Sequence, residues 1–245
     1  MTTAQLKGQT VVVIGGSAGI GLETARRARA EEAYVMLTAR NPERLQQAAD
    51  ELGALSATAF DATDTDQLER FFDGLPGPID HVIVTAGGPH YEPLADIDFA
   101  RARDFLDEHL LLPLRIARSA AGRMQPGGSL LFVGGTGARR PAIGLTLGGA
   151  VTVGKPALVA SLALEIAPVR VNLIAAGFVD TPLSAALLGD QLDARRDELR
   201  TTLPIGRVVG PDDVAALAVH LMANTALTGA TYDIDGGQQL LPRGV

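Results

Sequence analysis

The segment GGSAGIG, residues 15–21, is the first part of the chain whose residue types and spacing could do chemistry. Gly15, Gly19 and Gly21 have no side chains, so the backbone there can turn sharply and approach a pyrophosphate closely. The β-branched run TVVVIGG precedes the segment and the helical pattern LETARRARA follows it. Glycine-rich turns also serve ordinary chain reversal, but a strand before and a helix N-terminus behind favour a nucleotide site.

Two later segments extend this predicted site. In TARNPERL, Ala39 and Arg40 stand where an acidic residue would bind a ribose 2′-hydroxyl and an arginine would bind a 2′-phosphate. Because a guanidinium matches phosphate bidentately, we expect NADP(H) rather than NAD(H), the alternative being a solvated surface arginine. In FDATD, Asp61 could accept a hydrogen bond from the adenine amino group, or serve as a turn or cap residue for a helix starting near Asp64.

The elements that must position these residues alternate between short apolar runs and helical patterns. The apolar runs cover residues 10–16, 33–39, 54–61, 80–87, 128–135, 169–177 and 230–235, and the helical patterns cover 20–31, 42–52, 64–73, 98–123, 148–166 and 211–223. Most runs lack apolar/polar alternation, which is typical of strands buried on both faces of a parallel sheet. We expect an α/β fold, a three-layer doubly wound parallel sheet (Rossmann fold) of about seven strands, in a single domain over residues 1–245. The strandless stretch 178–209 predicts a substrate loop.

Composition excludes several classes of function. The net charge is −7 with both signs mixed along the chain, so we expect neither nucleic acid nor a membrane surface as a partner, but a small-molecule substrate. The chain has no cysteine and four histidines, which predicts no disulfide and no metal site. The N-terminal MTTAQLKGQT lacks the apolar run of a signal peptide, and no segment is expected to approach a membrane span. A cytoplasmic location is therefore expected.

The motifs, in this order, resemble those of the short-chain dehydrogenase/reductase family over nearly the whole chain. IGGSAGIG resembles the family's TGxxxGIG, FDATD its adenine-binding aspartate, VTAGG its NNAG and VNLIAAGFVDTP its NxIxPGxxxT. Ile14, Thr85 and Ala176 depart from these patterns. The resemblance implies a cofactor site at Gly15, Ser17, Gly19, Ile20, Arg40, Asp61, Ala62, Ala86, Gly87, Lys155, Gly177, Val179 and Thr181. It also implies a homotetramer or homodimer built on the long helices at 98–123 and 148–166.

The catalytic positions depart further from the family. Its members use asparagine to hold a relay water, serine to position the substrate oxygen, tyrosine to exchange the proton, and lysine to bind the nicotinamide ribose and lower the tyrosine pKa. Here His109 stands at the asparagine position, Gly134 or Gly135 at the serine and Val151 at the tyrosine, and Lys155 alone is retained. The chain's tyrosines are elsewhere, at Tyr34, Tyr91 and Tyr232. Loss of a general acid typically costs a factor of about 10² to 10⁴ in rate.

Lys155 and His109 are the predicted catalytic residues. Pro113 has no N–H for the His109 carbonyl, so we expect a water between that carbonyl and Lys155, the alternative being a kink that only shapes packing. His90, Tyr91, the His109 ring and Thr136 are further candidates for the substrate oxygen. The leading hypothesis is an NADP(H)-dependent oxidoreductase with a degenerate active site that reduces a small carbonyl-like or imine-like group. The alternative is an NADP(H)-binding sensor or scaffold without hydride transfer.

Overall fold

A computed structural model describes residues 4–241. Its strands are β1 (Thr10–Ile14), β2 (Tyr34–Ala39), β3 (Ser56–Ala59), β4 (Ile79–Val84), β5 (Met124–Gly135), β6 (Arg170–Ala176) and β7 (Thr231–Ile234). They form one seven-stranded sheet in the order β3-β2-β1-β4-β5-β6-β7, and every neighbouring pair is parallel. The predicted Rossmann fold is confirmed. The ends of the domain predicted over 1–245 lie outside the described residues, and its unity stays a prediction.

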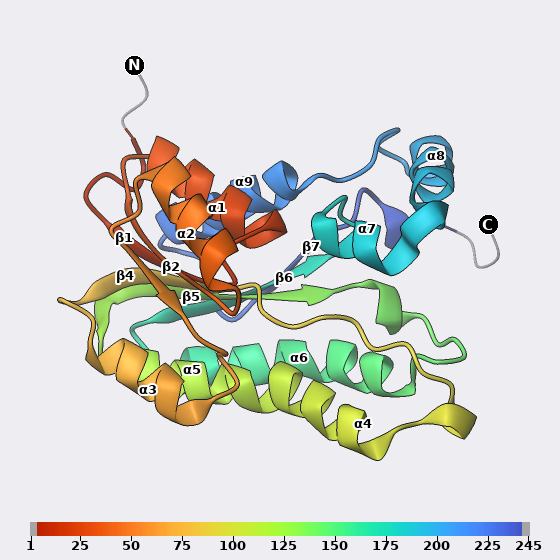
Figure 1. The fold of residues 1–245 in the computed structure, drawn as a ribbon, viewed down its shortest axis with the longest axis horizontal. Coiled ribbons are helices and arrows are strands. Elements are labelled where there is room, and N and C mark those ends of the chain that lie inside the picture. Colours follow the sequence, from red (N-terminus) through yellow and green to blue (C-terminus); the bar gives the residue numbers. More distant parts are fainter. Residues whose placement is uncertain (1–3, 242–245) are drawn as a thin grey trace.

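Helices cover both faces of the sheet (Figure 1). One face carries α1 (Gly19–Ala30), α2 (Pro42–Leu52) and α9 (Pro211–Ala223), and the other carries α3 (Thr65–Asp73), α4 (Phe99–Leu106), α5 (Leu112–Ala121) and α6 (Thr146–Glu165). In β1, Val11 and Val13 pack in the apolar cluster that includes α1 and α9, whereas Val12 and Ile14 pack in the cluster that includes α3, α5 and α6. A strand buried on both faces needs apolar residues at every position, which explains the solid apolar runs.

The helix predicted over 98–123 is not continuous. Between α4 and α5 lies a π-helical turn, η2 (Asp107–Leu111), after which the Leu112 N–H donates to the Asp107 carbonyl five residues earlier. Pro113 lies in the first turn of α5. Because proline has no N–H and its ring crowds the preceding turn, an α-helical ladder through this point cannot form. The helical stretch predicted over 98–123 is therefore present over residues 99–121, but with a π-helical turn in its middle, and this widened turn carries His109.

The segment predicted as a substrate loop, 178–209, is largely helical. It contains α7 (Pro182–Leu188), the short η4 (Gly189–Gln191) and α8 (Leu192–Thr202). An isolated parallel bridge between Val179 and Val209 closes its base. The segment is thus a helical excursion between β6 and α9 and not an irregular loop.

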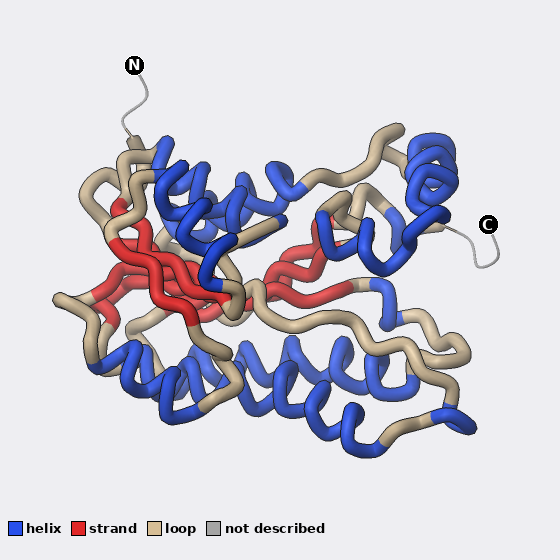
Figure 2. Tube along the Cα trace, in the orientation of Figure 1, coloured by secondary structure: helices blue, strands red, loops and turns tan. Residues whose placement is uncertain are grey.

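The order of strands reverses between β1 and β4, so the crevice at their carboxyl ends is where α/β sheets of this kind bind ligands. The glycine-rich turn follows β1 and a long loop follows β4. Figure 2 shows this loop, in tan, running from the end of the sheet along the layer of helices that contains α4 and α6.

Helix α6 corrects the expectation that no segment approaches a membrane span. By length and composition this helix could cross a membrane, although core helices of globular proteins meet the same criteria. It packs against β5 and β6, and 33% of its most apolar window is buried inside the protein. Its apolar character therefore serves the core in part.

Candidate active site

The glycine-rich turn is held against the end of β4. Gly15 has φ +97°, and a Cβ on it would lie 2.5 Å from Thr85 Oγ1, while a Cβ on Gly21 would lie 2.2 Å from the Gly15 carbonyl oxygen. The Thr85 hydroxyl lies 3.2 Å and 3.1 Å from the carbonyl oxygens of Ile14 and Gly15, to which it donates. The turn has no room for side chains, which leaves its backbone open to close approach by a phosphate.

The N-terminus of α1 carries no competing cap. Ala18 occupies the N-cap position, and no side chain of the described residues 4–241 accepts from the first N–H groups of the helix. Ser17, Gly19 and Ile20 at this end are half-buried. Free N–H groups at the positive end of a helix favour an anion. The geometry is therefore that of a phosphate site.

Arg40 and Asp61 lie at the ends of β2 and β3, as predicted. Arg40 is exposed and, within the described part of the chain, forms no hydrogen bond or ion pair. Asp61 Oδ1 accepts from the Thr63 N–H at 3.0 Å and the Thr63 hydroxyl at 2.8 Å, which is the turn role considered as the alternative. Asp64 caps α3 by accepting from the Gln67 N–H at 3.0 Å. Ala62 between them is buried.

The loop after β4 is held by two consecutive side chains of the π-helical turn. His109 Nε2 donates to the Gly88 carbonyl at 2.9 Å, and the Gly88 N–H opposes burial by lowering the pKa of the neighbouring Glu108 carboxyl. Gly87 has φ +105°, and a Cβ on it would lie 3.1 Å from His109 Cε1. Burial raises the pKa of Glu108 against the opposing effect of Arg40, which places both side chains in one electrostatic neighbourhood. Sequence reasoning missed Glu108, because nothing in DEHLLL marks it as buried.

The His109 ring is neutral at physiological pH. Burial, followed by the charge of Lys155, lowers the pKa of His109 to about 4, although its hydrogen bond to Gly88 opposes this. Its ring packs against Phe105 with centroids 4.4 Å apart. The ring is engaged by Phe105 and Gly88, in line with the packing role considered as the alternative, and the predicted water on the His109 carbonyl stays a prediction.

Lys155 lies in the middle of α6 and is buried, with 5% of its surface exposed. Lys155 is therefore not a surface lysine at the start of a helix. Its Nζ donates to the Val133 carbonyl at 3.0 Å, and burial alone lowers its pKa to about 8. A Cβ on Gly134 would lie 3.6 Å from Lys155 Cδ, so β5 runs alongside the lysine stem.

At the positions where the family has its catalytic tyrosine and serine, the described residues place no hydroxyl group next to Lys155. Val151, one turn before Lys155 on α6, is 5% exposed. Gly134 and Gly135 end β5. Thr136 is fully buried, and its hydroxyl lies 3.4 Å from the Ala176 carbonyl, to which its own N–H also donates at 2.8 Å. Thr136 therefore serves the sheet end and is not free for a substrate oxygen.

The segment after β6 closes the site from the opposite side. A Cβ on Gly177 would lie 2.7 Å from Asp235 Cβ, and Val179 is buried at the bridge to Val209. Thr181 caps α7 reciprocally with Ser184. A Cβ on Gly19 would lie 3.5 Å from Thr181 Cβ. Gly19 and Thr181, two predicted cofactor residues far apart in the sequence, therefore lie next to each other.

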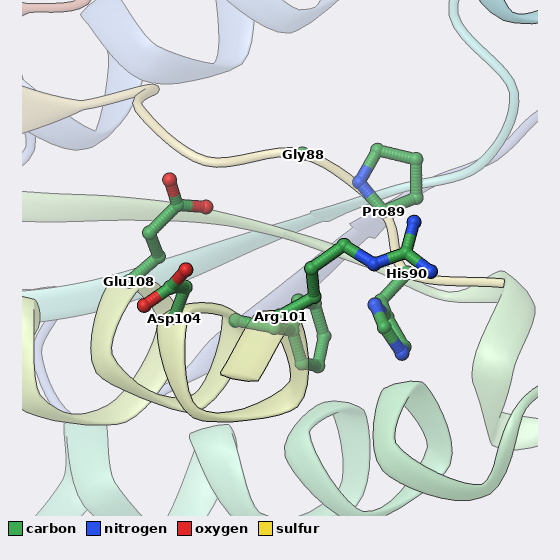
Figure 3. A pocket seen from close by; sticks show the side chains of 7 residues that line it. Gly88, Pro89, His90, Arg101, Asp104 and Glu108 are labelled. Atoms are coloured by element: carbon green, nitrogen blue, oxygen red, sulfur yellow. The ribbon is translucent and has the colours of Figure 1, made fainter. Parts of the chain in front are cut away.

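A small polar pocket of about 250 Å³ lies beside the site, lined by the loop after β4 and by α4 with η2 (Figure 3). His90 stacks on Phe105 at 5.1 Å, and its buried Nε2 lies 3.4 Å from Glu92 Oε2. Glu92 also pairs with Arg101 at 2.5 Å. Tyr91 is 69% exposed. His90 therefore belongs to the loop's anchoring, and Glu92 is a second buried carboxylate that sequence reasoning missed.

The two arginines of the loop after β5 do not face a substrate. Arg139 pairs with both oxygens of Asp233 at 2.5 Å and 2.8 Å, and Arg140 donates to the Gln238 carbonyl at 2.9 Å. They tie this loop to the C-terminal segment. Neither supplies a charge for an anionic substrate.

A family model described as enoyl-(acyl carrier protein) reductase matches residues 15–239 of this chain. The chain belongs to the short-chain dehydrogenase/reductase family. The matched region contains the glycine-rich turn, Lys155 and the segment after β6. The resemblance drawn from the motifs is confirmed at the level of the family.

Relatives of this chain match it nearly end to end. It is 28% identical over 250 residues to the short-chain dehydrogenase/reductase ATR9 of Stachybotrys chlorohalonatus, covering 95% of this chain and 97% of that protein. It is 29% identical over 257 residues to the NADP-dependent (R)-specific alcohol dehydrogenase of Lentilactobacillus kefiri, covering 96% and 98%. The structure of the MalC reductase/Diels-Alderase from Malbranchea aurantiaca matches with a TM-score of 0.90 at 26% identity, covering 98% of this chain and 100% of that chain. Fold and family are those of oxidoreductases.

Proposed function

We propose that this protein is an NADP(H)-dependent oxidoreductase that reduces a small, neutral carbonyl-like or imine-like group. The observation that carries the proposal is Lys155, a buried cation that has no acidic partner within residues 4–241 and lies at the ligand-binding edge of the sheet. Burying an unpaired charge costs several kcal/mol, so such a residue is typical of a functional site and not of a packing position.

The residues at the sheet edge suit a dinucleotide. A Cβ at Gly15 or Gly21 would collide with its neighbours, and the uncapped start of α1 offers N–H groups to a pyrophosphate. Arg40 is available for a 2′-phosphate, while Ala39 provides no carboxylate for a 2′-hydroxyl. The NADP dependence named for the Lentilactobacillus relative supports the same choice. Asp61 retains one carboxylate oxygen for the adenine amino group.

The chain's own residues would divide the work as follows. The turn and Arg40 bind the phosphates, and Lys155 binds the nicotinamide ribose. NADPH, when bound, supplies the hydride. Glu108 and His109 fix Gly88 and so orient the loop that closes over the site. Because Val151 carries no hydroxyl, the site is degenerate, and the proton must come from elsewhere.

The substrate class follows from the surroundings of the site. Exposed large apolar side chains come from several segments at this end of the molecule: Tyr91, Leu94, Ile143, Leu183, Leu187 and Leu240. These segments lie together beyond the carboxyl ends of the strands (Figure 1). With both loop arginines already paired, an apolar, uncharged substrate is favoured over an anion.

The outer face of the helical layer formed by α5 and α6 suits self-association. Leu111, Leu114, Val153 and Leu164 are exposed there, and Leu164 is 82% exposed. Exposed apolar side chains on two neighbouring helices are typical of subunit interfaces. A homodimer or homotetramer built on this face accounts for them.

A second candidate function is favoured by Val151 alone. Without the family's tyrosine, the same edge could bind NADP(H) as a sensor or scaffold without hydride transfer. Turnover separates the two: oxidation of NADPH by an aldehyde, ketone or imine supports the enzyme, whereas tight binding without turnover supports the scaffold.

The cofactor proposal is tested by calorimetric titration of the protein with NADPH and NADH. We expect NADPH to bind more tightly, and Arg40→Asp to weaken its binding by about 10- to 100-fold, as expected for charge-assisted hydrogen bonds of about 1.5–3 kcal/mol. Arg27→Asp, an identical charge change at the far end of α1, is the matched control and should leave binding within about twofold. Equal binding of NADPH by the wild type and Arg40→Asp would refute the role of Arg40.

A further inference from the structure

The buried ammonium of Lys155 has more donors than the described residues use. Its Nζ makes one hydrogen bond, to the Val133 carbonyl at 3.0 Å. An ammonium carries three N–H donors, so two are left for a ligand. No carboxylate among the described residues affects its ionisation, since burial is the sole cause of its shifted pKa.

The groups around Lys155 are apolar or neutral. Val151 precedes it by one turn on α6, and β5 presents Val133 and Gly134 alongside its stem. The titratable neighbour is His109 on η2, whose pKa of about 4 keeps it uncharged near neutrality. Lys155 is therefore the one charged group in this immediate environment, within residues 4–241.

The other candidate acids are already committed. His109 Nε2 donates to the Gly88 carbonyl, and the Thr136 hydroxyl donates to the Ala176 carbonyl. His90 Nε2 is buried without a hydrogen-bond partner among the described residues, 3.4 Å from Glu92 Oε2, and its ring stacks on Phe105. Tyr91 is exposed on the outer loop. Among the described residues, Lys155 combines burial with unused donors and a position directly beside Val151, where the family has its proton donor.

We propose that Lys155 is itself the proton donor of the reaction, giving a proton from Nζ to the substrate's oxygen or nitrogen while hydride reaches the adjacent carbon. The inference rests on the proposed function, with NADPH as the reductant. The hydride forms the new C–H bond, the π electron pair of C=O or C=N moves to the heteroatom, and an N–H bond of Lys155 breaks as the heteroatom gains its proton. Lys155 is left as a neutral amine and regains a proton from water. NADP⁺ and the alcohol or amine are the products.

This role requires an ammonium that can release a proton near neutral pH. Burial brings the pKa of Lys155 to about 8, which meets the requirement, since an efficient general acid has a pKa near the working pH. A lysine that only binds a ribose has no such requirement. The ionisation of Lys155 is therefore a direct test that needs no substrate.

Lysine ionisation can be read with unusual clarity, because the chain has only Lys7 and Lys155. With [13C]lysine labelling, the Cε signals of both are followed by NMR against pH, and Lys155→Met assigns them. Lys7 is the internal control, since its side chain is 69% exposed and its pairing with Glu32 raises its pKa. We expect a midpoint of about 8 for Lys155. A midpoint at or above the ordinary 10.5 would overturn the proposal.

Lys155→Arg separates proton donation from cofactor binding. Arginine keeps the charge and the donors but cannot be deprotonated in a protein. NADPH affinity should stay within about tenfold of wild type, while NADPH oxidation with benzaldehyde, cyclohexanone and a cyclic imine should fall by about 10² to 10⁴. Turnover within tenfold of wild type would overturn the proposal.

Lys155→Ala decides the matter if the arginine variant fails to fold. Methylammonium or ethylammonium should then raise the rate of NADPH oxidation by the alanine variant at least tenfold. If neither amine raises this rate, proton donation by Lys155 is refuted. Failure of the wild type to bind NADPH would overturn the proposed function and this inference together. Normal binding with an insensitive Lys155→Arg would overturn this inference only.

Discussion

Replacing Lys155 by methionine should stabilise the free protein at neutral pH. Burial lowers the pKa of Lys155 from its ordinary 10.5 to about 8, and each tenfold change in an ionisation constant corresponds to about 1.4 kcal/mol. Below pH 8 the amine is charged in the folded and unfolded chains alike, so the folded protein carries a desolvation cost of about 3 kcal/mol. Methionine removes this cost and also the hydrogen bond to the Val133 carbonyl, worth about 1 kcal/mol. The expected net gain is about 2 kcal/mol.

The gain should shrink as the pH rises. Between pH 8 and 10.5 the folded protein loses the Lys155 proton while the unfolded chain retains it, so the wild type gains stability relative to the methionine variant. By about pH 10 the remaining desolvation cost is below about 1 kcal/mol. The difference between the two proteins should then be near zero.

Urea unfolding followed by circular dichroism at pH 7 and pH 10 measures the difference in the free energy of unfolding between the two proteins at each pH. In thermal unfolding at pH 7, the midpoint of Lys155→Met should exceed that of wild type by about 4–8 °C, given about 2–4 °C per kcal/mol for a chain of this size. Lys7→Met is the control and should leave the urea midpoint unchanged at both pH values, because the pair of Lys7 with Glu32 is exposed. A destabilised Lys155→Met at pH 7, or a gain that is equal at both pH values, would refute the reasoning.

Three further outcomes are expected. Gly21→Ala places a methyl group 2.2 Å from the Gly15 carbonyl oxygen, so thermal unfolding should show a loss of about 1–3 kcal/mol and calorimetry at least tenfold weaker NADPH binding. Burial lowers the pKa of His81 to about 3 and of His109 to about 4, both below the ordinary value of 6.5. As the pH falls below 6.5 the unfolded chain gains protons that the folded protein does not bind, so the free energy of unfolding should fall. Urea titrations between pH 6 and 4 should show a loss of about 1.4 kcal/mol per pH unit for each histidine. If the protein forms the proposed oligomer through α6, Leu164→Asp should lower its mass in light scattering, and an unchanged mass would exclude that helix face as the interface.

The sequence predicted the sheet well because strand burial is written into single residues. Each of the seven apolar runs overlaps one strand of the sheet, although β4 and β5 begin before their runs, at Ile79 and Met124, and the run at 54–61 yields only Ser56–Ala59. A strand covered on both faces needs apolar residues at every position, and local composition reports this directly. The glycine-rich turn after β1 and Arg40 after β2 could also be predicted from the sequence, because each directly follows a strand that the sequence predicts.

The contacts of the loop after β4 could not be predicted from the sequence. His109 bonds to the Gly88 carbonyl and Glu108 lies beside the same glycine, and both side chains come from the π-helical turn η2, which no residue pattern in DEHLLL indicates. Pro113 predicted that one backbone hydrogen bond of the helix is missing. The sequence did not predict that the helix accommodates this proline with a π-helical turn. The ion pair between Glu92 and Arg101 could not be predicted either, because it requires the loop to fold back on α4.

Thr85 illustrates an intermediate case. As a departure from the family's asparagine it was visible in the sequence, but its function was not. In the structure its hydroxyl donates to the carbonyls of the turn at Ile14 and Gly15, which a hydroxyl on a short β-branched side chain can do from the end of β4. The replacement therefore supports the turn.

The two candidate functions make different demands on Lys155. A nucleotide-binding scaffold needs the turn, the helix N-terminus and Arg40 for the phosphates and a cation for the nicotinamide ribose, and none of these roles requires a titratable group of shifted pKa. It gains little from an ammonium whose burial costs about 3 kcal/mol, a large fraction of the roughly 5–15 kcal/mol that stabilises a typical domain. An enzyme that has valine in place of its usual acid gains a proton source from that same burial. The cost of Lys155 therefore favours catalysis, and a Lys155 midpoint near 8 with turnover lost in Lys155→Arg is the combination that only catalysis explains.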